Sequence, residues 1–403
     1  FAILGRHLFW PLGPGRPGRG TQVGKEARLV ARHPGAVAAV VGTVLVGLAV
    51  GSISYTPTYN TLSELPASTP SQQAYNTLLT GFPPGALAPT QVYVTGAAPL
   101  SQASLGGVTA TLSSTPGVAG VAPPQLSADA RTALISVVLA DNPYSNAALD
   151  LVGGPLPARA QAAAGGNRVL VGGQTATLAN VRQALHASMK VVFPVAFGII
   201  ALILGALLEA VLAPVNLLVC VGLTVAATLG ATSLVFLEGA GRSGIDFTLP
   251  IVIYLFVVAI GTDYNILLSS RLREEYLGGF LPRDAARAAI TNDAPTVAAA
   301  GIILAGTFAS LTLAGIANLT ELGFAVSVGI LLAAFGVAPL LVSALSALEG
   351  HRFWWPGHAR RVAAPSPAPP QANGAHGRAA ADGGNGQVGA EELPRDPAPP
   401  RGE

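Results

Sequence analysis

Six long stretches of this 403-residue chain are free of charged side chains, apart from a single aspartate in the fourth. They are residues 35–54, 191–208, 211–237, 247–270, 297–315 and 322–348. A helix of about 20 apolar residues crosses the roughly 30 Å of hydrocarbon in a bilayer, so each stretch is a candidate membrane span. Only 10% of the residues are Asp, Glu, Lys or Arg, whereas soluble domains are about one quarter charged. We therefore expect most of the chain to lie in lipid, which excludes a soluble enzyme.

The basic residues that flank these stretches indicate the orientation of the chain. The segment before the first stretch, the loop after the fourth and the segment after the sixth are all rich in arginine. With six crossings these three flanks lie on the same side, and short flanks rich in Arg and Lys mark the cytoplasm. The short loops on the opposite side contain only Arg242. Residues 55–190, between the first two stretches, are therefore expected to be extracytoplasmic.

The polar region 55–190 shows the periodicities of a small α+β domain. Strands are expected at 90–95, 117–121, 132–140 and 168–172, with helices at 101–114 and 145–163, the second broken near Pro155 and Pro157. This β-α-β-β-α-β order is typical of the ferredoxin-like motif. A lead-in helix is expected at 71–79, and a helix at 174–189 should lead into the second span. The sequence thus predicts a polytopic α-helical membrane protein with six transmembrane helices and an extracytoplasmic ferredoxin-like α+β domain inserted after the first helix.

Both ends of the chain differ from its apolar middle. His-Leu-Phe-Trp at 7–10 parallels His-Arg-Phe-Trp at 351–354, as expected if the chain were the second of two parallel repeats. Residues 1–34 are accordingly predicted to be a cytoplasmic linker from a first half that is missing here. Residues 349–403 become rich in Pro, Ala and Gly and are predicted to form a cytoplasmic basic flank and a disordered tail. The middle divides into a first span, 35–54, the outer domain, 55–190, and a five-helix transmembrane bundle, 191–348.

Asp263 is the only ionisable acid inside the six stretches. A carboxylate within hydrocarbon costs at least about 2.5 kcal/mol, so it normally faces protein or water and marks an ion pathway. Thr262 and Tyr264 offer hydroxyl groups to it, and Gly261 permits a close helix approach. No Lys or Arg lies within the stretches, which favours an acid that exchanges protons over a buried ion pair. The alternative is an aspartate that only hydrogen-bonds a neighbouring helix and holds the bundle together.

The remaining polar residues exclude several classes of function. Asp246 and Glu321 are expected as solvated caps at the outer membrane boundary. The histidines lack metal-ligand spacing, the only cysteine is Cys220, and no Gly-Lys-Ser/Thr phosphate loop occurs. We therefore expect no metal, no disulfide, no cofactor and no direct use of ATP. The near balance of 22 basic and 20 acidic residues gives no sign of nucleic-acid binding.

Short motifs spread along the chain carry a resemblance to one family. They are Leu-Pro-Ala at 65–67, Val-Gly-Gly-Gln-Thr-Ala at 171–176, Gly-Ile-Asp-Phe at 244–247, Gly-Thr-Asp-Tyr-Asn at 261–265, Ser-Arg-Leu-Arg-Glu-Glu at 270–275 and Gly-Ile-Ile-Leu-Ala-Gly-Thr-Phe-Ala at 301–309. Together they resemble the MMPL family of RND-superfamily transporters over about residues 1–360. The motif at 261–265 is similar to the Asp-Tyr helix of that family.

This resemblance implies a bacterial plasma-membrane transporter with two six-helix halves, each with an outer porter domain, that exports lipids or other hydrophobic molecules using the proton gradient. It assigns Asp263 and Tyr264 to a proton relay shared with a pair from the other half. The supporting residues are expected to be Thr262, Asn265, Thr307 and Ser310. The chain departs from many relatives in having apolar residues at Ala298, Ala299, Ala333 and Ala334.

We therefore predict that the chain is the second half of a proton-driven exporter of lipids or other hydrophobic molecules, and not an enzyme. Its partners would be protons, a lipid or hydrophobic small-molecule cargo, the missing half, and further copies or accessory proteins. The alternative is a membrane scaffold that binds lipid or assists assembly without transport. Asp263→Asn distinguishes the two, because an exporter should lose activity while still inserting, whereas a scaffold should tolerate the change.

Overall fold

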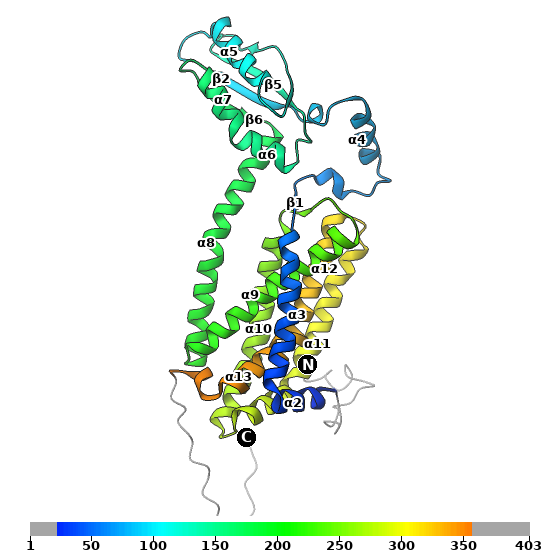
Figure 1. The fold of residues 1–403 in the computed structure, drawn as a ribbon, viewed down its shortest axis with the longest axis vertical. Coiled ribbons are helices and arrows are strands. Elements are labelled where there is room, and N and C mark those ends of the chain that lie inside the picture. Colours follow the sequence, from blue (N-terminus) through cyan, green and yellow to red (C-terminus); the bar gives the residue numbers. More distant parts are fainter. Residues whose placement is uncertain (1–21, 357–403) are drawn as a thin grey trace, which may run out of the picture. The chain divides into compact units, whose positions relative to one another are not determined.

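The computed structural model describes residues 22–356, and six of its helical segments are long and apolar enough to cross a membrane. They are Pro34–Ser54, Gln174–Leu208, Leu212–Gly239, Leu249–Leu277, Pro282–Leu313 and Ala317–Trp354. Each overlaps one of the uncharged stretches, so the predicted number and order of spans are confirmed (Figure 1). The predictions for residues 1–21 and 357–403, which include most of the linker and the tail, lie outside the described residues.

The spans are built on six helices, some of which extend beyond the hydrocarbon-like stretch. They are α3 (Pro34–Val50), α8 (Gln174–Leu208), α9 (Leu212–Ser233), α10 (Leu249–Leu277), α11 (Pro282–Ala309) and α12 (Ala317–Leu331). Proline opens α3 and α11, where its missing N–H would have had no helical partner in any case. The helix predicted at 174–189 and the second span form one continuous helix, α8, of 35 residues.

Glycines allow the spanning helices to approach one another closely. A Cβ atom added to Gly230 of α9 would lie 1.8 Å from the carbonyl oxygen of Leu48 on α3. One added to Gly329 of α12 would lie 2.4 Å from a methyl carbon of Val257 on α10. Helix association in lipid depends on such backbone contacts, because the lipid tails remove the hydrophobic drive. Gly230 therefore sets the spacing between α9 and α3, and Gly329 sets the spacing between α12 and α10.

The sixth span changes its winding partway along. After α12 the chain forms a π-helix, Leu332–Val342, and then α13 (Ser343–Glu349) and a short 3₁₀ helix, Gly350–Trp354. Pro339 lies inside the π-helix, where it cannot donate a backbone hydrogen bond. In the apolar part of this span 67% of the residues are buried within the protein, against 11% for the α8 span. The sixth span is therefore a central element of the bundle, and α8 is a peripheral one.

An α+β insert lies between the first span and the other five. Its main elements are β2 (Thr90–Thr95), α5 (Gln102–Ser113), β3 (Val118–Val121), β5 (Thr132–Leu139), α6 (Asn146–Gly153), α7 (Pro155–Ala163) and β6 (Arg168–Gly172). The strand order is β3-β5-β2-β6, and every neighbouring pair is antiparallel. Val92 of β2, for example, pairs with Ile135 on one side and Val171 on the other. The predicted β-α-β-β-α-β order is thereby confirmed.

The core of the insert follows from strict alternation along its two central strands. Alternate residues of β2 and β5 are buried, as the period of two in a strand requires. The buried valines Val92 and Val94 pack in one cluster with Leu105 and Leu112 of α5 and Leu156 of α7. The helices α5 and α7 thus cover one face of the sheet with apolar side chains.

The predicted break near Pro155 and Pro157 is confirmed: the segment 145–163 forms two helices, α6 and α7, because Pro155 in the first turn of α7 interrupts the backbone hydrogen bonding. Two short strands of this region were not predicted. The strand β4 (Gln125–Leu126) pairs with Ala133 and Leu134, near the start of β5. The strand β1 (Pro57–Thr58) pairs in parallel with β7 (Ile245–Asp246), just before α10. The lead-in helix is α4 (Pro70–Gly81).

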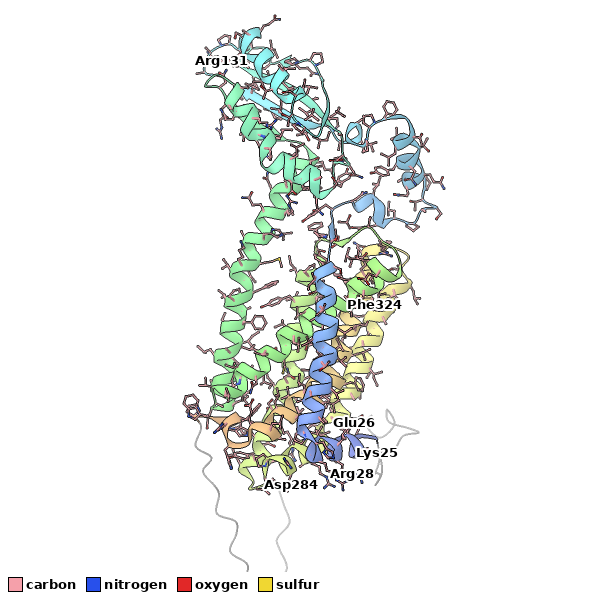
Figure 2. All side chains as sticks on the ribbon, viewed as in Figure 1. Lys25, Glu26, Arg28, Arg131, Asp284 and Phe324 are labelled. Atoms are coloured by element: carbon pink, nitrogen blue, oxygen red, sulfur yellow. The ribbon has the colours of Figure 1, made fainter. Side chains whose placement is uncertain are left out.

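The helix α2 (Gln22–Arg32) occupies part of the segment predicted as a linker. Its Ala27 and Val30 are fully buried and belong to the main core of the bundle, whereas its charged side chains are exposed. Figure 2 shows Lys25, Glu26 and Arg28 at the same end of the bundle as Asp284 of α11. The segment just before the first span is therefore an amphipathic helix packed on the bundle.

Candidate functional site

Asp263 lies in the middle of α10, on a face that no other described helix covers. The exposed residues Leu255, Ala259, Asp263 and Leu267 follow one another at intervals of four, which places them on one side of the helix. No hydrogen bond or ion pair joins the Asp263 carboxylate to another side chain in the described part of the chain. A bare carboxylate facing lipid is strongly disfavoured. This face therefore requires a protein surface or water against it.

Tyr264 points to the opposite side, into the bundle. Its side chain is buried, and its hydroxyl oxygen lies 4.0 Å from the position that a Cβ atom on Gly301 of α11 would take. That same position lies only 2.6 Å from the Cβ atom of Ala334 in the π-helix. A Cβ atom added to Gly261 would lie 3.7 Å from that of Ala333 in the sixth span. Tyr264 thus lies where α10, α11 and the sixth span meet, next to the exposed Asp263.

The small residues at this crossing explain what Ala333 and Ala334, which depart from the pattern of many relatives, do in the structure. Ala333 and Ala334 are both buried and both face glycines of neighbouring helices. A larger polar side chain at Ala334 would have no room against Gly301 at the spacing found here. The alanines therefore allow close packing behind Tyr264, and they provide no polar partner for it.

A stripe of buried polar side chains runs along the inner face of α10. Thr262, Asn265 and Ser269 are all buried, and within residues 22–356 their side-chain oxygen and nitrogen atoms have no hydrogen-bond partner. An unpaired buried polar group costs about 1–3 kcal/mol, so such groups usually have a functional reason. Ser269 was not predicted, although its position one turn after Asn265 was a readable signal. This stripe and Asp263 make α10 polar on two different faces.

Thr307 lies near the end of α11, and Ser310 is the first residue of the 3₁₀ helix that follows it, Ser310–Leu313. Both side chains are exposed, and each hydroxyl donates a hydrogen bond to its own helix: Thr307 to the carbonyl of Ile303 at 2.9 Å, and Ser310 to that of Thr307 at 2.7 Å. At 1.5 Å per residue they lie about 9 and 13 Å along the helix axis from Gly301, which contacts the Tyr264 region. The structure does not bring these two hydroxyls to the Asp263 carboxylate.

A second polar cluster lies where the α9–α10 loop meets the start of α12. Glu321 of α12 is 2% exposed; its Oε1 lies 2.6 Å from Nη1 of Arg242, and its Oε2 accepts a 2.9 Å hydrogen bond from the backbone N–H of Asp246. Asp246 is also buried, and its carboxylate accepts hydrogen bonds from the backbone N–H and the hydroxyl of Thr248. The expectation of solvated caps at Asp246 and Glu321 is therefore wrong, because both residues are buried. The Glu321 carboxylate holds the loop on α12, and the Asp246 carboxylate bonds Thr248, directly before α10.

Glu64, from the segment that follows the first span, joins this cluster. Burial, the negative charge of Asp246 and a hydrogen bond with Asp246 raise the pKa of the Glu64 carboxyl from 4.5 to about 7. Burial and the charge of Asp246 also raise the pKa of Tyr55, whose hydroxyl donates to the backbone oxygen of Asp246 at 3.3 Å. Glu64, Asp246, Glu321 and Arg242 all line one pocket of about 410 Å³.

Sequence reasoning missed the role of Glu64 because its partners lie far along the chain. The only local signal was the Leu-Pro-Ala motif at 65–67, whose Leu65 and Pro66 also line the pocket. Within residues 22–356 no group of three or more His, Cys, Asp or Glu side chains has an arrangement suited to a metal ion.

Comparison with known proteins connects this architecture to one family. A family model described as the MMPL family matches residues 64–369. A membrane protein of Streptomyces coelicolor is 37% identical over 364 residues, which cover 88% of this chain and 43% of the relative. The apo-petrobactin exporter of Bacillus anthracis is 31% identical over 347 residues, 84% of this chain and 46% of that protein.

Mycobacterial transport proteins are similar over a shorter region. The transport protein MmpL12 of Mycobacterium tuberculosis is 30% identical over 271 residues, 61% of this chain and 23% of its own length. The chain spans about half the length of the curated relatives that it matches over most of its residues. The match of the family model over most of the chain, together with the six spans and the α+β insert, shows that the chain belongs to the MMPL family of RND-superfamily membrane proteins.

Proposed function

We propose that this chain forms one six-helix half, with its outer domain, of a proton-driven exporter of lipids or other hydrophobic molecules. Family membership supports export, since one relative is named an exporter and others are named transport proteins. The observation that carries the proposal is the exposed carboxylate of Asp263 in the middle of a membrane helix. A second six-helix half, packed against this face, would cover it.

Asp263 and Tyr264 would act together as one side of a proton relay. Asp263 would exchange a proton on the face shared with the second half. Tyr264, the next residue, is packed against Gly301 and Ala334 and would convey the change in charge to the helix crossing. Thr262 and Asn265 would serve the relay from the inner face of α10, where their polar atoms are buried without partners in the described chain. Thr307 and Ser310 are weaker candidates for the relay, because their hydroxyls already donate hydrogen bonds to carbonyl groups of α11.

The proton gradient can drive such a change. A proton that crosses 100 mV releases about 2.3 kcal/mol, and each pH unit adds about 1.36 kcal/mol. This energy shifts an equilibrium between two conformations if Asp263 binds its proton more tightly in one of them. The helix α8 starts directly after strand β6 and continues as one element through the second span. A movement of the bundle would therefore reach the sheet of the insert through α8.

The arginine-rich end of the bundle would face the cytoplasm, and the insert would lie outside it. In the described chain, α2, the last turns of α10 and the first turns of α11 carry Arg28, Arg32, Arg271, Arg273, Arg283 and Arg287. Such a bias in short flanks is the usual determinant of orientation in the plasma membrane.

The test is Asp263→Asn in the organism that encodes the chain. Lipids and other hydrophobic metabolites are compared by mass spectrometry between the wild type and a deletion strain, and the species retained inside the deletion strain define the cargo. We expect the wild-type protein to restore export in the deletion strain. The Asp263→Asn variant should not restore export, although it inserts in the membrane at a normal level. Asp141→Asn, at an exposed acid of the insert, is the matched control and should restore export fully.

The same experiment distinguishes the scaffold alternative. A scaffold that binds lipid or assists assembly does not need a proton-exchanging carboxylate, so Asp263→Asn would restore the wild-type lipid profile. That result, with normal amounts of the variant in the membrane, would contradict the proton-relay proposal.

A further inference from the structure

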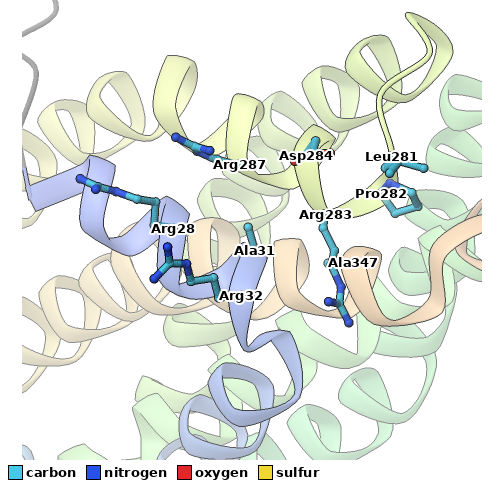
Figure 3. A pocket seen from close by; sticks show the side chains of 9 residues that line it. All are labelled: Arg28, Ala31, Arg32, Leu281, Pro282, Arg283, Asp284, Arg287 and Ala347. Atoms are coloured by element: carbon cyan, nitrogen blue, oxygen red, sulfur yellow. The ribbon is translucent and has the colours of Figure 1, made fainter.

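A basic pocket of about 490 Å³ lies at the end of the bundle where α2, the start of α11 and α13 meet. Four arginines line it, Arg28, Arg32, Arg283 and Arg287, together with one acid, Asp284, and four apolar residues. Figure 3 shows the guanidinium groups of Arg28, Arg32 and Arg287 on one side of the pocket, and Arg283 pointing past Ala347 on the other. Two separate helices thus direct positive charge into one space.

These arginines lack anionic partners within the described chain. The side chains of Arg32, Arg283 and Arg287 make no hydrogen bond or ion pair within residues 22–356, and Arg28 uses only its Nε, which donates to the carbonyl of Gly24 at 2.8 Å. Arginines nearby behave differently. Arg271 pairs with two glutamates, Glu274 and Glu275, at 2.8 and 2.9 Å, and Arg273 pairs with Glu209 at 2.5 Å.

This contrast indicates that the pocket is arranged for an external anion. Four arginines and a single exposed aspartate line the pocket, so its net charge is positive and attracts an anion. The planar guanidinium binds phosphate oxygens in pairs, which makes arginine the preferred residue for phosphate recognition. A volume of about 490 Å³ lies within the roughly 300–1,000 Å³ of ordinary ligand sites. A phosphate-bearing group of modest size therefore fits the pocket in both charge and space.

The position of the pocket favours a lipid over a free anion. Arg32 lies two positions before the first residue of the α3 span, and Ala347 lies near the end of the uncharged stretch of the sixth span. The pocket thus lies near the level where these two spans leave the hydrocarbon. Leu281, which lines the pocket, is an exposed apolar side chain, and so are its chain neighbour Phe280 and Leu29, the residue after Arg28. Basic pockets with apolar borders at span ends are suited to anionic headgroups whose acyl chains remain in the bilayer.

We propose that this pocket binds the phosphate of an anionic phospholipid, such as phosphatidylglycerol, from the leaflet at this end of the bundle. The arginines of α2 and α11 hold the phosphate from two sides, while Leu281 and Leu29 face the glycerol and acyl region. A bound lipid then ties α2, next to the first span, to the start of α11. The proposal rests on this pocket alone and holds whether or not Asp263 exchanges protons.

The test uses the purified full chain in detergent, with phosphatidylglycerol and phosphatidylcholine as probes in native mass spectrometry and in thermal unfolding. We expect phosphatidylglycerol to bind and to raise the melting temperature, and phosphatidylcholine to do so at least about tenfold more weakly, because it carries no net charge. Arg283→Gln/Arg287→Gln should weaken phosphatidylglycerol binding by at least about tenfold, since it removes two charge-assisted hydrogen bonds.

The matched control removes the same charge elsewhere. Arg131→Gln/Arg159→Gln changes two exposed arginines of the insert and should bind phosphatidylglycerol as the wild type does. Asp284→Asn provides a test of opposite sign, because loss of the only acid in the pocket should strengthen binding. If the double arginine variant does not fold, the Asp284→Asn result and the wild-type lipid preference still decide the question.

Three outcomes would overturn the proposal. Equal binding of the two lipids by the wild type removes the anionic preference. If the pocket variant and the insert variant lose binding equally, the binding depends on the total charge of the protein and not on this pocket. Displacement of phosphatidylglycerol by inorganic phosphate at equal concentration makes the pocket a site for a soluble anion and not for a lipid.

Discussion

At the scale of single residues, Gly301 decides how closely three helices meet behind Tyr264. A Cβ atom at this position would lie 2.6 Å from that of Ala334, too close for any real pair of carbon atoms. Overpacking of this kind costs about 1–3 kcal/mol. We expect Gly301→Ala to lower the free energy of unfolding by that amount, measured by denaturant unfolding in detergent, and to impair export because Tyr264 is displaced.

Gly306 provides the control for this change on the same helix. No atom lies within 4 Å of an added Cβ there, and alanine favours helix over glycine by about 1 kcal/mol. Gly306→Ala should therefore leave stability unchanged or raise it. If the two variants lose stability equally, the close approach of Gly301 to Ala334 does not determine the packing around Tyr264.

The sequence located Asp263 but did not reveal which way it faces. The helix α10 is apolar on nearly all sides, so no hydrophobic stripe distinguishes an inner from an outer face. The facing of each residue depends on how α9, α11 and the sixth span pack around α10. This is why Thr262 and Asn265 turned out to be buried while Asp263, between them, is exposed. An isolated acid can be found in a sequence, whereas its surroundings depend on distant segments.

At the scale of elements, the ion pair of Glu321 with Arg242 holds the α9–α10 loop on α12. Glu321 is almost fully buried, and the Arg242 side chain is about one-third exposed, at 31%. Surface pairs contribute up to about 1 kcal/mol, and breaking a buried pair costs about 3–5 kcal/mol. We expect Glu321→Gln to cost an intermediate amount, about 2 kcal/mol, in denaturant unfolding.

A nearby acid of the same region serves as the comparison. Glu238 is exposed, and its carboxylate accepts a long hydrogen bond, 3.5 Å, from the hydroxyl of Ser54. Glu238→Gln should change stability by no more than about 0.5 kcal/mol. A similar, small effect of both substitutions would show that the loop is held by β1–β7 pairing and apolar contacts, and not by Glu321.

The positions of elements were predictable where a local pattern determines them. Two strands, β2 and β6, have the predicted limits, 90–95 and 168–172, because alternation along a strand is a local property. The helix ends were less predictable. An uncharged run marks the thickness of the hydrocarbon, but α11 begins many residues earlier, where its polar turns pack on α2. The start of α8 at Gln174 was predicted, because its polar turns continue directly into the second span. The pairing of β1 with β7 joins residues far apart in sequence and left no local trace.

At the scale of the whole molecule, Glu64 gives the protein a defined response to pH. Its pKa is about 7 in the folded chain and 4.5 in the absence of the fold. Between these values the folded state keeps a proton that the unfolded state releases, so stability falls as pH rises from about 4.5 to about 7. We expect thermal unfolding in detergent to show this decline, and Glu64→Gln to reduce it.

The control for the pH response is Glu26→Gln, which changes an exposed acid of α2 at the basic end of the bundle (Figure 2). This variant should keep the wild-type dependence on pH. An unchanged decline in Glu64→Gln would assign the proton to another group and contradict the role given to Glu64.

The sixth span has one mechanical consequence for the molecule. A π-helix holds more residues per turn than an α-helix, so its eleven residues from Leu332 to Val342 occupy less length than the same residues in α winding would. Conversion of even one turn would lengthen this rod and rotate everything beyond it, including α13. Because Ala334 lies near the beginning of the wide turns, that rotation would also twist the contact at Gly301. Elongation of the sixth span and rotation of α13 would therefore occur together.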